Sequence, residues 1–81
     1  MMKAKIEITL KNGVLDPQGK AIEGALSGLG FQEASNVRQG KVIEFEIDAV
    51  DEAAARDRAE EMCRKLLANP VMENYSIAIS A

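Results

Sequence analysis

Cys63 is the residue of this sequence with the clearest potential as a nucleophile, and the chain contains no histidine to activate it. Histidine is the commonest general base and a frequent metal ligand, so its absence excludes most triad chemistry and many metal sites. Cys63 lies in a helical pattern beside Met62 and Leu66. The sequence therefore favours a buried structural thiol over a catalytic one.

Acidic residues are the second group that could do chemistry, because clustered carboxylates bind cations. Those near the start of the second predicted helix are Asp48, Asp51, Glu52, Asp57, Glu60 and Glu61. Carboxylates at a helix start cap free amides, which favours a cap and a solvated face over a metal site. Gly13 and Gly19 flank another helix start without either phosphate-loop pattern. We expect no catalytic residue, no metal and no cofactor in this chain.

Length and charge narrow the class of protein further. Eighty-one residues form a single domain, residues 1–81. Ten basic against 13 acidic residues leave a net charge of -3, which argues against binding nucleic acid. The start, Met1–Ile6, lacks the apolar run of a signal peptide, and no stretch is long enough to span a membrane. We expect a cytoplasmic protein.

The first half of the chain predicts a strand followed by a helix. From Lys3 to Leu10 apolar and polar residues alternate, as in a strand with one buried face. Asp16 can cap a helix, Pro17 fits its first turn, and Gly30 suits a left-handed helix end. The buried stripe of this helix is expected to consist of Ile22, Ala25, Leu26 and Leu29.

The second half predicts a hairpin, a second helix and a final strand. These elements cover Phe31–Arg38 and Lys41–Ile47, then a helix from about Asp48–Asp51 to Asn69, then Val71–Ile79. Gln39-Gly40 supplies the short break of the hairpin, and Pro70 ends the helix because proline cannot continue it. The buried side of the second helix is expected to hold Ala55, Ala59, Met62 and Leu66.

This order of elements, βαββαβ, is that of the ferredoxin-like α+β fold. Right-handed crossovers would place two helices on one face of a four-stranded antiparallel sheet, with the strands ordered 4, 1, 3, 2. The other face is expected to be uncovered and polar. Its residues would be Lys5, Glu7, Thr9, Val42, Glu44, Glu46, Asn74, Ser76 and Ala78.

Architecture alone leaves several functions open. A stand-alone small-molecule-binding regulatory domain and a small acylphosphatase-like enzyme share this arrangement. The sequence lacks the arginine-bearing phosphate loop of acylphosphatases, the CxxC pair of metal chaperones and the aromatic segment of RNA-binding domains. The regulatory domain stays open as the main alternative.

Four segments taken together carry a more specific signal. They are Leu10–Gly19 (LKNGVLDPQG), Leu29–Phe31 (LGF), Val37–Lys41 (VRQGK) and Met62–Val71 (MCRKLLANPV). Their combination, which spans almost the whole chain, resembles the PurS family, the small subunit of phosphoribosylformylglycinamidine synthase.

The resemblance implies a non-catalytic subunit of a ligase in de novo purine biosynthesis. The holoenzyme would use ATP, Mg and glutamine-derived ammonia to convert formylglycinamide ribonucleotide to formylglycinamidine ribonucleotide. The nucleotide sites would belong to a PurL-type synthetase, and the thiol nucleophile to a PurQ-type glutaminase. This chain would bridge them as a homodimer or higher homo-oligomer and support ammonia transfer.

A candidate partner interface can be assembled from the motif segments. Val14 and Leu15 form an apolar pair in a loop, which points equally to contact with another chain and to packing within this one. Charged residues nearby could contact a partner or face solvent. The complete candidate set is Lys11, Val14, Leu15, Arg38, Lys41, Asn69, Pro70 and Tyr75.

The last predicted strand offers a second route to self-association. In the expected strand order it lies at an edge, and Tyr75–Ala81 contains neither charge nor proline, the usual protections of an edge. We therefore expect a homodimer joined partly along this edge.

Overall fold

The alternating N-terminal segment forms the central strand of the sheet in the computed structural model, which describes all residues from Met1 to Ala81. The strand β1 (Met2–Leu10) buries Ala4, Ile6 and Ile8 and exposes the residues between them. β2 (Gly40–Ile47) and β3 (Glu73–Ser80) flank it, both antiparallel, in the order β2-β1-β3. One face of the sheet is thus apolar and the other polar.

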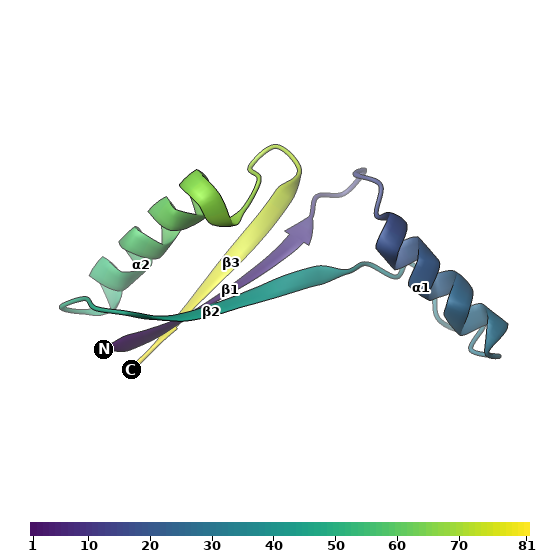
Figure 1. Ribbon diagram of the computed structural model, residues 1–81, viewed down its shortest axis with the longest axis horizontal. Coiled ribbons are helices and arrows are strands. Elements are labelled where there is room, and N and C mark those ends of the chain that lie inside the picture. Colours follow the sequence, from purple (N-terminus) through teal and green to yellow (C-terminus); the bar gives the residue numbers. More distant parts are fainter.

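The helix α2 (Glu52–Met62) covers the apolar face (Figure 1). Asp51 caps it, since the Ala54 N–H donates to Asp51 Oδ1 at 2.8 Å. Ala55 and Ala59 are completely buried. Their small side chains let the helix backbone come close to the isoleucines of β1, which form the core with it.

A single wide turn, η1 (Cys63–Leu67), follows α2 and changes which side chains face the sheet. The Ala68 N–H donates to the Cys63 carbonyl five residues back at 3.0 Å, as in a π-helix. One extra residue per turn rotates the following side chains. The prediction that Leu66 is buried is therefore wrong: it is 82% exposed, while Cys63 and Ala68 lie in the core.

The predicted four-stranded sheet is wrong, because Phe31–Arg38 forms turns and irregular structure in place of a strand. The backbone amides of Val37, at the end of this segment, and of Gln39, just after it, bond to side chains of the first helix region. The Val37 N–H donates to Glu23 Oε1 at 3.0 Å, and the Gln39 N–H donates to Asp16 Oδ2 at 2.7 Å. With these amides satisfied, no hairpin forms at Gln39-Gly40. The three remaining strands keep their predicted neighbours.

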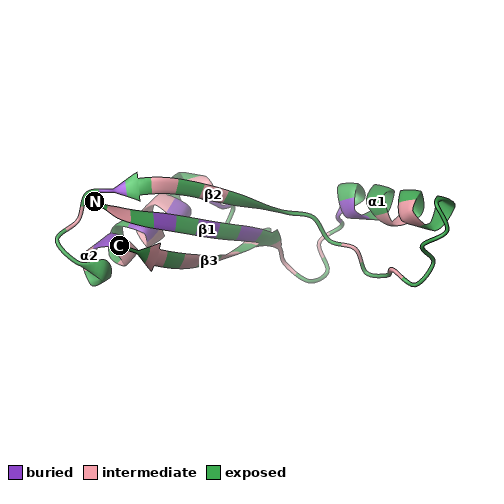
Figure 2. Ribbon diagram, turned by 90° about the horizontal axis from the view of Figure 1, so that it is seen from below, coloured by how far each residue is buried: buried purple, intermediate pink, exposed green.

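The helix α1 (Pro17–Gly28) does not lie on the sheet, which corrects the prediction of two helices on one face. It projects beyond the end of the sheet, so the molecule measures 50 × 26 × 14 Å (Figures 1 and 2). The Cα radius of gyration is 16.1 Å. A compact chain of this length has a radius of gyration of about 12 Å. Only the α+β class and the sheet-and-α2 half of the predicted architecture are confirmed.

Most of the stripe predicted to be buried on α1 is therefore open to solvent, and of its four residues only Leu26 is half-buried. Ile22 is 40% exposed and Leu29 74% exposed. The helix itself forms as expected, with Asp16 as its cap and Gly30 at a φ of 98°. We refer to residues 15–31, which carry α1 and its exposed apolar side chains, as the arm, and to the sheet with α2 and η1 as the body.

Candidate partner interface

Most of the predicted interface residues gather where β1 ends and β3 begins. Leu10, the last residue of β1, lies opposite Glu73, the first of β3. The Lys11 N–H donates to the Met72 carbonyl at 2.9 Å, which ties the chain after β1 to the turn before β3. Arg38 Nη2 donates to the Lys11 carbonyl at 3.2 Å. Two segments far apart in the sequence thus meet at Lys11.

Asp16 also links the loop after β1 to the segment before β2. Its Oδ1 accepts the Gly19 N–H at 2.8 Å and its Oδ2 accepts the Gln39 N–H at 2.7 Å. Asp16 is only 5% exposed. The pKa of Asp16 is lowered, mainly by the amide of Gln39 and then by that of Gly19, because both bonds favour the ionised form.

The sequence left open whether Val14 and Leu15 pack within this chain or contact another chain, and the structure gives a different answer for each residue. Val14 is half-buried, its N–H donates to the Lys11 carbonyl at 3.2 Å, and it lines a hollow of about 310 Å³ with Arg38 and Lys20. Leu15 is 73% exposed. Leu15 is thus the apolar side chain of this loop that is free to contact another chain.

The turn between η1 and β3 holds the next group of predicted residues. The Asn69 N–H donates to Glu73 Oε1 at 2.7 Å, and Asn69 Oδ1 accepts the Val71 N–H at 3.0 Å. Lys41 Nζ lies 3.8 Å from Glu73 Oε2, and Pro70 is exposed. Asn69 therefore organises the turn, while Lys41 and Pro70 remain accessible beside it.

Tyr75 lies apart from this group. It faces Ile8 across the strands and is half-buried against the core cluster that contains Cys63. Its ring belongs to the body, two residues into β3. The structure thus brings together every candidate except Tyr75, and their role at an interface stays a prediction.

The outer edge of β3 is less open than its sequence indicates. Arg56 of α2 reaches over the strand, and its Nη1 donates to the Ile77 carbonyl at 2.9 Å. A carbonyl that already accepts an arginine N–H is a poorer acceptor for a partner strand. Arg56 therefore guards the middle of an edge that contains no charge of its own.

An apolar groove of about 330 Å³ runs between β2 and the α2 to η1 segment. Phe45 of β2 lines one side of the groove, and Met62, Leu66 and Leu67 line the helical side. Its charged rim is paired internally, with Glu61 accepting from both Arg58 and Lys65. In the predicted fold the first helix would cover this part of the sheet. The groove and the arm are the features that sequence reasoning missed.

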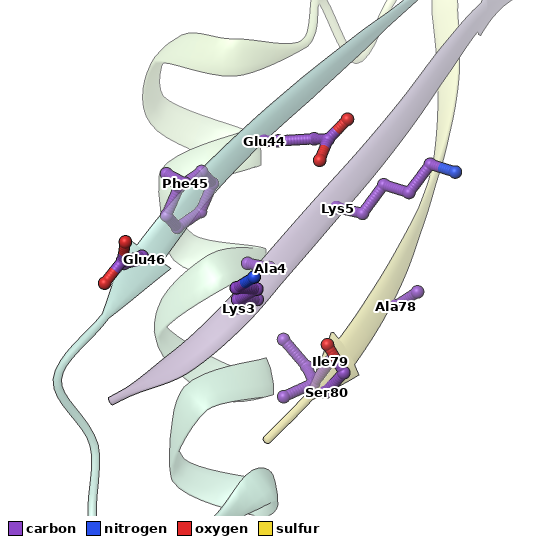
Figure 3. A pocket seen from close by; sticks show the side chains of 9 residues that line it. All are labelled: Lys3, Ala4, Lys5, Glu44, Phe45, Glu46, Ala78, Ile79 and Ser80. Atoms are coloured by element: carbon purple, nitrogen blue, oxygen red, sulfur yellow. The ribbon is translucent and has the colours of Figure 1, made fainter.

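The uncovered sheet face carries a second, more polar hollow of about 450 Å³ (Figure 3). Lys5 and Glu44 lie on this face, directly opposite each other in the register, and Ala78 lies beside them on β3. Phe45 points to the other side, toward α2. The polar face predicted from the sequence is therefore present on the three strands.

Few groups in the chain are suited to catalysis. Cys63 is completely buried, and burial raises the pKa of its thiol, which disfavours the reactive thiolate. No cluster of three or more potential metal ligands occurs. No helix has the length and apolar character that crossing a membrane requires.

Comparison with known proteins gives a consistent result across nearly the full chain. Residues 3–81 match the family model PurS, described as phosphoribosylformylglycinamidine (FGAM) synthase. The chain is 43% identical to the phosphoribosylformylglycinamidine synthase subunit PurS of Methanocaldococcus jannaschii, over 98% of this chain and 95% of that protein. The crystal structure of that PurS superposes with a TM-score of 0.90, covering 99% of this chain and 96% of the other at 42% identity. A chain in the structure of PurLQS from Thermotoga maritima superposes with a TM-score of 0.88 at 31% identity, covering 96% of this chain and 95% of that chain.

Proposed function

The chain belongs to the PurS family, and we propose on that basis that it is the small, non-catalytic subunit of phosphoribosylformylglycinamidine synthase in purine biosynthesis. The observation that carries this proposal is the nearly full-length match to a chain of a PurLQS assembly. Its partners are then a PurL-type synthetase and a PurQ-type glutaminase, in the cytoplasm.

The chemistry of the holoenzyme is assigned to the partners. This chain contains no histidine, and its one thiol is buried and hard to ionise. ATP, Mg and glutamine would bind the other subunits, and this chain would hold those subunits in the arrangement that lets ammonia pass between them. Its contribution is geometric, through binding surfaces on the arm, on the sheet and where the arm meets the body.

A second part of the proposal is that the chain acts as a homodimer that exchanges arms. An isolated helix of about 12 residues is marginally stable in water, so α1 gains stability only when its apolar stripe is covered. Within its own chain Ile22 stays 40% exposed and Leu29 74% exposed. A partner copy supplies a matching surface, the groove along Phe45 and Leu66.

Arm exchange also explains why no helix of the same chain lies beside α2 on the sheet. The groove occupies the place beside α2 where the predicted fold has its first helix, and it is lined mainly by carbon. Its rim charges already form ion pairs, so an apolar helix can dock without leaving a charge unpaired. Pairing along the β3 edge remains the competing prediction, weakened by Arg56 at Ile77.

Reconstitution tests the subunit role. The synthetase and glutaminase of the same organism are assayed for glutamine-dependent formation of formylglycinamidine ribonucleotide with and without this chain. We expect activity only when the chain is present, and co-elution of the three proteins in size-exclusion chromatography with glutamine and ADP. Equal activity without the chain, or no co-elution under any of these conditions, contradicts the proposal.

A further inference from the structure

The arm reaches the body only through two neighbouring crossings of the chain. One crossing runs from β1 through residues 11–16, and the other runs through residues 37–39 into β2. α1 makes no substantial contact with any strand or with α2. Its direction in space therefore depends on what holds the two crossings together, a region we call the joint.

Asp16 is the centre of this joint. One carboxylate oxygen closes the first turn of α1 through Gly19, and the other accepts the amide of Gln39 on the opposite crossing. Glu23 adds a bond from the helix to the Val37 amide, and Arg38 adds one to the Lys11 carbonyl. The ionised Asp16 oxygens make the shortest of these bonds and are nearly shielded from water.

Gly19 shows how closely the crossings approach. A Cβ atom at this position would lie 2.4 Å from the Val37 carbonyl oxygen and 2.9 Å from Asp16 Oδ2. Real Cβ atoms do not tolerate such distances, so only glycine allows the helix to lie this near the second crossing. The joint is tight on both sides of the Asp16 carboxylate.

We propose that Asp16 is a positioning residue that fixes the direction of the arm, so that α1 is held in the orientation required to reach a second copy of the chain. This inference rests on the arm-exchanged homodimer proposed above. A freely swinging arm would lose orientational freedom on docking, and that entropy opposes association. An arm already fixed in direction avoids this cost, and the Asp16 bonds supply the fixation.

The substitution Asp16→Asn separates positioning from capping. Asparagine is as good a helix cap as aspartate, so its oxygen can still accept the Gly19 amide. Its NH₂ group then faces the Gln39 N–H, and two donors cannot bond. We expect dimerisation to weaken about tenfold, the effect of losing one charge-assisted bond. The control Asp51→Asn, at the cap of α2, should leave dimerisation unchanged, because that carboxylate accepts only from Ala54.

Gly19→Ala provides a test of opposite sign. Alanine strengthens an isolated helix relative to glycine, so a purely structural requirement for helicity predicts tighter dimers. The positioning role predicts weaker dimers, since the new methyl group pushes Val37 away. Dissociation constants from sedimentation equilibrium decide between the two signs.

The direction of the arm can be measured directly. Spin labels at Ser27→Cys on α1 and Ser76→Cys on the open sheet face report their separation in samples diluted with unlabelled protein; both residues are exposed, whereas Cys63 is buried. We expect a narrow distance distribution in the parent chain and in Asp51→Asn. The distribution should broaden in Asp16→Asn and in Gly19→Ala.

The outcomes separate the two proposals. A parent chain that is monomeric at micromolar concentration overturns arm exchange, whereas the spin-label widths still test the joint. A parent dimer with unchanged affinity and unchanged label widths in Asp16→Asn overturns the positioning role and leaves the dimer standing.

Discussion

The two α-helices of this protein begin with the same chemistry and end in opposite environments. Each starts with an aspartate whose Oδ1 accepts an amide three residues on at 2.8 Å. α2 buries Ala55 and Ala59 completely against the sheet, whereas the apolar side chains of α1 remain exposed. Local sequence therefore determines that a helix forms and which side is apolar, but not which surface covers that side.

The largest expected contrast lies between core substitutions in the body and in the arm. Ile6→Ala, at a completely buried position in β1, should lower the free energy of unfolding by about 3 kcal/mol. Ile22→Ala on the arm should change it by less than about 0.5 kcal/mol in a dilute, monomeric sample, because that side chain is already partly solvated. Urea unfolding at low protein concentration measures both. Equal losses would show that the arm folds against the body.

A charge on the arm should break assembly while the body stays folded. Leu26→Asp places a carboxylate in the apolar stripe, and burying that charge should weaken dimerisation about 100-fold. Ser27→Asp is the matched control, with the same charge one residue away on an exposed position. Sedimentation equilibrium gives the two dissociation constants, and the same pair can be used in the reconstituted synthase. Similar dissociation constants for the two variants would place the interface elsewhere.

The cap of α2 should matter for the stability of the body. Asp51→Ala removes the acceptor of the Ala54 amide and should cost about 1 kcal/mol of unfolding free energy. Asp16→Ala should shift the same urea midpoint less, since the helix it caps contributes little to the body. A reversed order of the two midpoints would mean that α1 is the more strongly coupled helix.

Acid should loosen the arm before it unfolds the body. The folded-state pKa of Asp16 lies below its ordinary value of 3.8, so its contribution is complete above pH 3.8 and is lost as the pH falls through the lower folded value. We expect the spin-label distribution to broaden in that acid range in the parent chain. In Asp16→Asn the distribution should already be broad and should not change there. If acid does not broaden the spin-label distance distribution of the parent chain, the ionised form of Asp16 does not hold the joint.

Much of the body, and the helix of the arm, could be predicted from local pattern. Alternation in β1, the Asp16 and Asp51 caps and the left-handed Gly30 all depend on neighbours in sequence, and the structure confirms them. The segment Phe31–Arg38 could not be read in this way. Its sequence suits an extended run, but the Val37 amide and the Gln39 amide just after it bond to carboxylates 14 and 23 residues earlier in the chain.

The sequence motifs pointed to residues that lie near one another in the structure, and their role at an interface stays a prediction. Lys11 and Arg38 meet at the joint, and the strand register brings the turn that Asn69 organises beside Lys11, through the bond from the Lys11 N–H to the Met72 carbonyl. The exposure of Leu66 was not predictable, since it depends on the π-helical turn Cys63–Leu67, which no spacing rule anticipates.

The strand order has a consequence for how the chain is made. β1 lies between β2 and β3, and Lys3 faces Ser80, so the first strand synthesised is completed by the last. Pairings this distant in sequence form slowly, and during synthesis one side of β1 stays unpaired until the C-terminal strand leaves the ribosome. The arm precedes β2, α2 and β3 in the chain, so it is synthesised well before the sheet can close. Because a helix of this length is marginally stable alone, the nascent chain is expected to expose both the unpaired side of β1 and an arm that is only partly helical.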